Sequence, residues 1–325
     1  MDIDFVVTWV DDNDSGWIAE KSKYMPVRPA INTEIRYRDY GTFKYFFRSI
    51  EKYAPWVHRI YVITTGHYPT WLNLNSDKIV LIRHSDYIPA TYLPTFNSNP
   101  IEINLHRIEN LSEHFVLFND DMFLVNNTTV DDFFYKSYPR SLGVYSPITP
   151  YRDFSDVVFN NVRLINRHFN KFTDLKQNWW KIFNFRYGID NFRTIMTLPW
   201  KHILGYRDLH LPMAHLKSTF AEVWQEEPGE MMRTSKNRFR TVADINHWVF
   251  NYWNIESGRF YPQKKNFGKL FTLNTFAEVE SNLLQTKYKT ICINDDYDVD
   301  NYDLKMQRLI ELFEKKFPEK SQFEK

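Results

Sequence analysis

Two acidic turns carry the clearest chemical signal in this sequence of 325 residues. Asp120 and Asp121 directly follow the apolar run FVLFN, and Asp295, with another acid after it, follows KTICIN. Carboxylates at the end of a buried strand suit a hard divalent cation, which takes oxygen ligands and often bridges to substrate phosphates. The alternative is a solvated turn that caps the next element. Because the pattern occurs twice, it favours a metal site if one sheet holds both strands.

A histidine and an arginine supply the other candidate reactive groups. His215 lies in LPMAHLKS, just before a predicted helix, and a histidine with a near-neutral pKa can take a proton from a sugar hydroxyl. Arg240 precedes Asp244 by four residues, which allows an ion pair on one helical face. A guanidinium held in this way can grip a phosphate through two hydrogen bonds. A structural histidine and a weak surface ion pair are the alternatives, and position alone favours them.

The elements that must position these groups alternate between strand and helix over the first ~125 residues. Strands are predicted at residues 4–10, 59–65, 78–84 and 115–119, with helices at 40–53 and 100–113. This order predicts an α/β fold with an open, mainly parallel sheet covered by helices. Residues 126–210 have weak periodicity and are predicted to be an irregular or helical insertion. Helices at 217–226, 241–254 and 302–317 and a strand at 289–294 complete the prediction.

Further polar groups lie where the predicted strands end. Asp11 follows the first strand and Thr65 ends the second. In open α/β sheets ligands bind at the carboxyl ends of the strands, so this is the expected place of a binding site. Arg48, in the first long helix, could face a diphosphate or form part of the solvated side of the helix. Trp9 could stack on a base or fill the core.

Composition excludes several classes of protein. The 41 Lys and Arg nearly balance the 40 Asp and Glu, so no overall positive field attracts nucleic acid. Cys292 is the single cysteine, so no intrachain disulfide can form. Neither a phosphate-binding P-loop nor a dinucleotide-binding glycine motif is present. Without a signal peptide at the N-terminus or an apolar run of about 18–20 residues, we expect a soluble cytoplasmic protein. Peripheral attachment to membrane-bound polysaccharide-assembly machinery stays open.

Four long strings, in order, resemble the signatures of the Stealth family. IDFVVTWVDDND resembles the first signature, and the stretches RDYGTFKYFFRSIEKYAPWVHRIYVITTGHYPTWL and LPTFNSNPIEINLHRIENLSEHFVLFNDDMF resemble the second. The run from MAHLKSTFAEVW to ESGRFYP resembles the third, and KTICINDD with FPEKSQFE resembles the fourth. Bacterial members of this family are capsular and exopolysaccharide phosphotransferases. An animal relative is the catalytic subunit of the N-acetylglucosamine-1-phosphotransferase that tags lysosomal enzymes.

The resemblance implies a reaction, a cofactor and a fold. A nucleotide sugar, expected to be a UDP-sugar, would donate its sugar-1-phosphate to a hydroxyl of an oligosaccharide or polysaccharide acceptor. The products would be a phosphodiester and a nucleoside monophosphate, and the cofactor would be Mg²⁺ or Mn²⁺. The fold would be a single, nucleotide-sugar-binding, Rossmann-like (GT-A-like) catalytic domain over residues 1–325. In it, the insertion at 126–210 would face the acceptor, and residues 211–325 would complete the core.

The resemblance also implies roles for individual residues. Asp120, Asp121 and Asp295 would hold the metal, and His215, Arg240, Asp244 and Asp121 would serve catalysis, with His215 as a base or as a transient nucleophile. The residues expected to bind the donor are Trp9, Asp11, Arg38, Asp39, Arg48, Thr65, Asn97 and Ser98. Two other functions stay open. One is a metal-dependent glycosyltransferase that releases a nucleoside diphosphate, and the other is a non-catalytic carbohydrate-binding protein.

Overall fold

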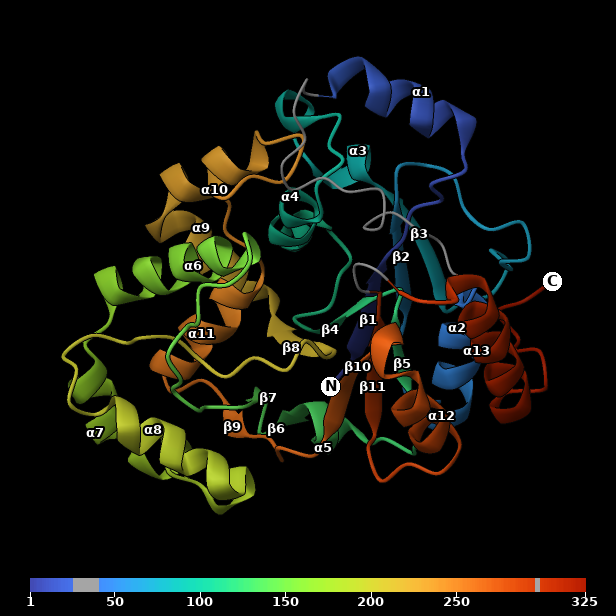
Figure 1. The fold of residues 1–325 in the computed structure, drawn as a ribbon. Coiled ribbons are helices and arrows are strands. Elements are labelled where there is room, and N and C mark those ends of the chain that lie inside the picture. Colours follow the sequence, from blue (N-terminus) through green and yellow to red (C-terminus); the bar gives the residue numbers. More distant parts are fainter. Residues whose placement is uncertain (26–40, 296–298) are drawn as a thin grey trace.

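A five-stranded sheet forms the centre of the molecule. The computed structural model describes residues 1–25, 41–295 and 299–325. The strand order is β3 (Ile79–Arg83), β2 (Ile60–Thr64), β1 (Ile3–Thr8), β4 (His114–Asn119) and β8 (Met213–Leu216). The first four strands are parallel, and β8 runs antiparallel to β4 at one edge (Figure 1). The predicted α/β fold with an open, mainly parallel sheet is therefore confirmed.

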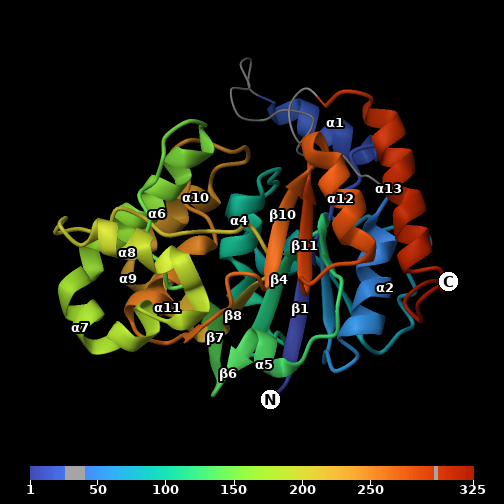
Figure 2. The same cartoon turned by 60° about the horizontal axis from the view of Figure 1, so that its bottom comes forward.

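The two faces of the sheet are covered by different helices. Alternate side chains of a strand point to opposite faces, so Phe5 and Val7 join one hydrophobic cluster while Val6 joins the other. The first cluster packs beneath α2 (Phe43–Tyr53), α12 (Phe276–Leu284) and α13 (Tyr302–Lys316). The second packs beneath α4 (Ser98–Ile103), α6 (Phe154–His168), α9 (Lys217–Glu226) and α11 (Trp248–Glu256). Figure 2 shows these two groups of helices on opposite sides of the central strands.

Two smaller sheets extend this arrangement. One has the order β10 (Gly268–Thr272), β11 (Thr290–Asn294) and β5 (Met122–Leu124), with β5 antiparallel to β11. The other has the order β6 (Phe134–Tyr135), β7 (Tyr138–Ser141) and β9 (Tyr261–Pro262). Because β5 follows β4 after a two-residue turn, the first small sheet brings the end of β11 beside that turn.

Residues 126–210 are largely helical. They contain α5 (Val130–Phe133), α6, α7 (Lys171–Ile182), the 3₁₀ helix η4 (Phe185–Asp190) and α8 (Asn191–Thr197). α6 packs against α11, whereas α7 and α8 lie at the end of the molecule farthest from α2 and α13 (Figures 1 and 2). Within the described ranges, no helix has the length and apolar character needed to cross a membrane.

Most predicted strands agree with the structure within one or two residues, but two helices differ. The helix predicted over 100–113 is split into α4 and the 3₁₀ helix η3 (Leu105–Arg107), where the Asn104 side chain donates to the carbonyl of Pro100. The helix predicted over 241–254 begins only at Trp248. Elements that the apolar pattern did not predict are α1 (Ser15–Tyr24), α3 (His84–Tyr87), η2 (Ala90–Tyr92), α10 (Pro228–Ser235), η5 (Leu273–Thr275), β5, β6, β7, β8, β9 and β10.

Candidate functional site

The two acidic turns lie side by side. Asp120 and Asp121 form the turn between β4 and β5, and the backbone N–H of Ile293 in β11 donates to the carbonyl of Asp121 at 2.9 Å. The Cys292 thiol donates to Asp121 Oδ2 at 3.3 Å. Asp295 follows β11 directly. Antiparallel pairing of β5 with β11 thus confirms that the two turns meet, although through a second sheet and not the central one.

Asp121 has an oxygen that the described residues do not satisfy. The residue is buried, and its Oδ1 has no hydrogen-bond partner among the residues that the structure describes. Burial raises the pKa of Asp121, while nearby His210 and the bond from Cys292 lower it. An unpartnered buried carboxylate oxygen is costly and is a feature that a bound cation would satisfy.

The side chains around Asp121 define which cation would fit. Ligand atoms of Asp121, His210 and Cys292 lie within 4.8 Å of one another. Burial raises the pKa of the Cys292 thiol well above its usual range, so the sulfur keeps its proton and donates it to Asp121. The carboxylate oxygens of the acidic turns remain as ligands, and the His210 imidazole lies beside them. This donor set suits Mg²⁺ or Mn²⁺ better than a thiolate-bound metal.

His210 is a site residue that the sequence analysis missed. It lies on the loop before β8, partly buried, with a left-handed backbone φ of 48°. Burial lowers the pKa of His210, Asp121 raises it and Arg240 lowers it, so the imidazole is mostly neutral near pH 7. The signal was a second histidine five residues before His215, separated from the strand by Pro212. A neutral histidine beside a carboxylate and an arginine can accept a proton.

His215 lies in the core, where the structure favours a structural role over the predicted catalytic one. It sits in β8 opposite Phe115, is 0% exposed and meets the ring of Phe220 edge to face. Burial lowers its pKa to about 3. One ring nitrogen, Nε2, lies 3.1 Å from His247 Nδ1, and the other is buried without a partner in the described structure. A base that must contact the acceptor does not fit this position, because no part of the ring reaches the surface.

Arg240 is positioned by the N-terminal turn of α4. Its Nη2 donates to Ser98 Oγ at 2.7 Å. Glu102, one turn further along α4, is buried, and burial raises its pKa to about 7, while Arg240 and a hydrogen bond from Ser98 lower it. His247 Nε2 lies 3.9 Å from Glu102 Oε2. The structure therefore brings together two predicted site residues, Arg240 and Ser98. It also places Glu102 near Arg240 and His247 near Glu102, and neither of these two residues was predicted.

Asp244 organises the loop that carries Arg240, and it does so without a helix. Its carboxylate accepts hydrogen bonds from the side-chain amides of Asn97 (2.8 Å), Asn99 (3.0 Å) and Asn237 (2.7 Å). It also accepts from the backbone N–H and the hydroxyl of Thr241. The predicted helical pair with Arg240 is wrong because residues 241–247 are not helical. Asp244 is buried and touches no surface, so it is a positioning residue.

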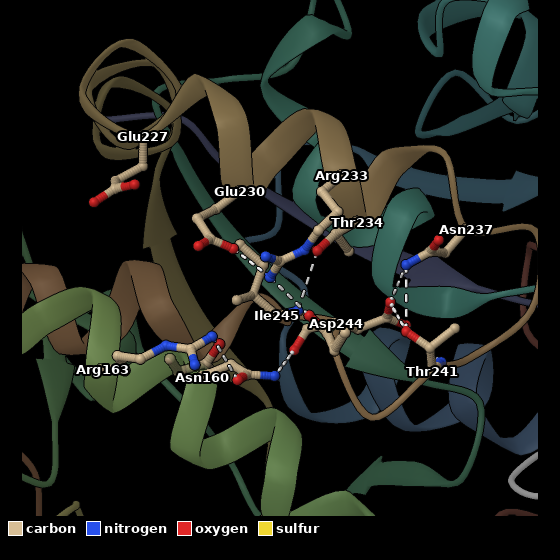
Figure 3. Close-up of polar contacts among 12 residues, drawn as sticks. Asn160, Arg163, Glu227, Glu230, Arg233, Thr234, Asn237, Thr241, Asp244 and Ile245 are labelled. Atoms are coloured by element: carbon tan, nitrogen blue, oxygen red, sulfur yellow. Dashed lines mark hydrogen bonds and ion pairs between the residues drawn. The ribbon is translucent and has the colours of Figure 1, made fainter.

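Figure 3 shows how the same loop is held from outside. The Asn160 amide of α6 donates to the carbonyl of Asp244 at 2.9 Å, and the backbone N–H of Ile245 donates to Thr234 Oγ1 of α10 at 3.2 Å. Asn237 and Thr241 approach the Asp244 carboxylate from the other side. Contacts from α4, α6 and α10 thus fix residues 237–245, and with them the place of Arg240.

The ends of β1 and β2 are joined by a histidine. The backbone N–H of Asp11 donates to His67 Nε2 at 2.9 Å, and His67 Nδ1 lies 2.8 Å from Thr65 Oγ1. Asp11 and Thr65 are therefore neighbours at the carboxyl edge of the sheet, as the strand order predicts. Trp9 is different: it is 6% exposed and stacks on Phe43, so its ring offers no open face to a base. The base-stacking interpretation of Trp9 is wrong.

Arg48 is also a structural residue, which corrects its predicted donor-binding role. Its guanidinium makes two hydrogen bonds of 2.8 Å to the buried carboxylate of Glu324 and donates to the carbonyl of Phe317 at 2.7 Å. Glu324, Phe317 and Glu314 belong to the C-terminal part of the chain, so Arg48 ties α2 to that segment. Arg38 and Asp39, two other predicted donor-binding residues, lie outside the described residues.

Comparison with known proteins identifies the family. Models of the Stealth conserved regions 1, 2 and 4 match residues 1–26, 36–141 and 281–325. The capsular polysaccharide phosphotransferase WcwK of Streptococcus pneumoniae is 46% identical over 325 residues, with 99% of each chain covered. The chain belongs to the Stealth family.

Other Stealth proteins and two solved structures complete the comparison. The exopolysaccharide phosphotransferase cps2G of Lactiplantibacillus plantarum is 40% identical, covering 100% of this chain and 97% of its own. The receptor polysaccharide phosphotransferase WefC of Streptococcus gordonii is 40% identical, covering 99% and 98%. Among solved structures, an active-site mutant of LgtC matches at 9% identity with a TM-score of 0.41, over 96% of this chain and 95% of its own. The galactosyltransferase LgtC with donor and acceptor analogues matches with a TM-score of 0.37, also at 9% identity, over 97% of this chain and 96% of its own.

Proposed function

We propose that this enzyme transfers a sugar-1-phosphate from a nucleotide sugar to a hydroxyl of a saccharide acceptor in the synthesis of capsular or exopolysaccharide. Membership of a family of polysaccharide phosphotransferases supports the reaction class. We assign the reaction to this site because Asp121, His210 and Arg240 lie near one another. Asp121 can bind a cation, His210 can accept a proton, and Arg240 can bind a phosphate.

The proposed chemistry is one displacement at phosphorus. The acceptor oxygen forms a bond to the sugar-bearing phosphorus, and the bond from that phosphorus to the nucleoside monophosphate breaks, with the electron pair leaving on the monophosphate. An imidazole nitrogen of His210 takes the proton of the acceptor hydroxyl. Arg240, fixed by Ser98, stabilises the charge on the phosphoryl oxygens. In-line positioning of donor and acceptor supplies much of the rate in such transfers.

A divalent cation, Mg²⁺ or Mn²⁺, would be held by Asp121 with Asp120 and Asp295 and would offset charge on the diphosphate. Asp11 and Thr65, at the ends of β1 and β2, lie at the edge where the nucleotide would bind. Residues 126–210 supply the acceptor side of the single catalytic domain, and residues 211–325 complete it. A UDP-sugar in the cytoplasm is the proposed donor.

The test is to identify the released nucleotide. Purified enzyme is incubated with Mg²⁺, a panel of nucleotide sugars and a capsule-type oligosaccharide. Release of a nucleoside monophosphate, with phosphorus retained in the product by ³¹P NMR, would establish the proposal. A nucleoside diphosphate would instead show attack at the anomeric carbon, as in a glycosyltransferase. Donor binding with no turnover for any acceptor tested would favour a carbohydrate-binding protein.

A further inference from the structure

The segment of α7, η4 and α8 presents large apolar side chains to solvent. Phe185 is 86% exposed and Ile189 is 78% exposed, and Trp179, Phe192 and Trp200 are each more than half exposed. Isolated exposed apolar residues are common, but such a concentration within about 20 residues marks an interaction site. We call the exposed side chains of residues 172–201 the α7–α8 surface.

The orientation of α8 shows that this exposure is built into the helix. Phe192, Ile195 and Met196 follow the i, i+3, i+4 spacing and all lie on its exposed face. The opposite, buried face carries Thr194 and Thr197. The hydroxyl of Thr194 accepts from the backbone N–H of Tyr145, and the hydroxyl of Thr197 donates to the carbonyl of Thr194. The polar face of α8 therefore forms hydrogen bonds inside the protein, and its apolar face is exposed to solvent.

Cations accompany these apolar side chains. Residues 171–202 contain six Lys or Arg against two Asp, but Lys171 and Lys181 are buried and donate to backbone carbonyls. Lys176, Arg193 and Lys201 are exposed, and Arg193 pairs with Asp190 at 3.4 Å. Exposed Lys265 lies next to η4, where its backbone N–H donates to the carbonyl of Arg186 at 3.2 Å. The α7–α8 surface is therefore positively charged as well as apolar.

We propose that the α7–α8 surface docks the enzyme on an anionic lipid bilayer. Tryptophan and phenylalanine enter the boundary between head groups and acyl chains, while lysine and arginine stay with anionic head groups. A second protein fits less well, because the cores of protein interfaces are depleted in lysine. α7 and α8 lie at one end of the molecule, where they can meet a flat surface (Figures 1 and 2).

This docking does not depend on the proposed reaction, because Asp121, His210 and Arg240 are not part of the α7–α8 surface.

Vesicle flotation tests the proposal with the full-length protein. We expect it to float with vesicles that contain phosphatidylglycerol and to bind phosphatidylcholine vesicles at least tenfold more weakly. A triple substitution of Lys176, Arg193 and Lys201 to Gln should weaken binding about fivefold per charge, roughly a hundredfold in total. A triple substitution of Phe192, Ile195 and Met196 to Ser should abolish it. Circular dichroism and urea unfolding confirm that each variant is folded.

A matched control lies on the opposite side of the molecule. Leu304 of α13 is 66% exposed, and Leu304→Ser should leave vesicle binding unchanged. Failure of the wild-type protein to float with anionic vesicles would overturn the proposal, as would normal binding by both triple variants. Sedimentation equilibrium distinguishes membrane docking from self-association. If the wild-type protein self-associates but binds no vesicles, and the Ser variant is monomeric, the α7–α8 surface binds a second copy of the chain. That result would also overturn the proposal.

Discussion

Two histidines five residues apart illustrate what sequence could and could not predict at the scale of single residues. His210 and His215 are chemically identical, and only the structure shows that one borders the acidic turn while the other faces the core from β8. The strand ends before Asp120 and Asp295 were predictable, because apolar runs mark strand ends well, but the pairing of β5 with β11 that brings the two turns together was not. Burial of a polar side chain was not, since it depends on helices distant in sequence, as with α9 and α11 over His215.

Substitution of the two histidines should have opposite consequences. His210→Gln should lower kcat/KM by roughly 10²–10⁴-fold with little effect on stability, because it removes the proton acceptor. His215→Ala should lower the free energy of unfolding by about 2–4 kcal/mol, because it leaves a cavity beside Phe115 and Phe220. Steady-state kinetics and urea unfolding measure the two effects, with exposed His202→Gln as the control. Full activity in His210→Gln would refute the assigned base.

The pH dependence of kcat/KM should show only an acid limb in the neutral range. Because burial lowers the pKa of His210 below the ordinary histidine value, its ring is mostly neutral at pH 7 and above. The rate should therefore be flat from pH 7 to pH 8 and decline below that range as the imidazole takes a proton. Initial rates at saturating metal test this profile. A decline in rate between pH 8 and pH 7 would mean that His210 is protonated in the resting enzyme.

At the scale of elements, loop 237–245 shows how hydrogen bonds to a single carboxylate can hold a segment that has no helix or strand. The apolar stripe after Thr241 predicted a helix, but Asp244 accepts hydrogen bonds from three asparagines and keeps residues 241–247 non-helical. Long-range polar contacts of this kind leave no periodic pattern in sequence. The apolar strands were predictable because their burial needs only a short run of β-branched and aromatic residues.

Asp244→Ala should lower both stability and turnover. It leaves the amide of Asn99 without an acceptor and removes one of two acceptors from the amides of Asn97 and Asn237, which we expect to cost about 2–4 kcal/mol. Arg240 then loses the loop geometry that places it, so kcat should fall more than donor affinity. Val242→Ala, on the same loop and 45% exposed, is the control that should change neither. Unchanged kcat in a folded Asp244→Ala protein would separate this loop from catalysis.

Arg48 tests whether α2 binds the donor or the C-terminal segment. Arg48→Met leaves Glu324, whose side chain is 4% exposed, without its cation, and this should destabilise the protein by about 3–5 kcal/mol. The KM for the donor should stay within about twofold where the variant is folded, because hydrogen bonds inside the protein satisfy the guanidinium. Urea unfolding and donor titrations measure both. A large rise in KM at unchanged stability would restore the donor-binding role.

The whole molecule combines a predictable sheet with an unpredicted polar network in one of its two cores. Glu256, at the end of α11, is buried and accepts hydrogen bonds from the hydroxyls of Tyr145 and Tyr206. Burial raises the pKa of Glu256 to about 8. Composition predicted many buried aromatic residues, but it could not show that tyrosines from residues 126–210 surround a carboxyl from the later part of the chain.

This network predicts that stability falls as the pH rises towards 8. The folded state holds the Glu256 proton up to about pH 8, whereas the unfolded chain releases it near its ordinary pKa of 4.5, so stability falls between these two values and levels off above pH 8. Between pH 7 and pH 9 we expect a loss of about 1 kcal/mol from this group, most of it below pH 8. Glu256→Gln, which resembles the protonated acid, should lose less over the same range in urea unfolding. An identical loss in both proteins would contradict the assignment.

The pairing of β5 with β11 has a consequence for how the enzyme is made. Asp121 and Cys292 touch although they lie 171 positions apart in the sequence, so the acidic turn gains its neighbour only after β11 has left the ribosome. Contacts between residues so far apart in sequence form late, because the chain entropy of closing a long loop must be lost before the contact can stabilise the fold. A nascent chain that ends before Thr290 has the central sheet but lacks the strand that completes the turn. We therefore expect activity only in chains that include β11.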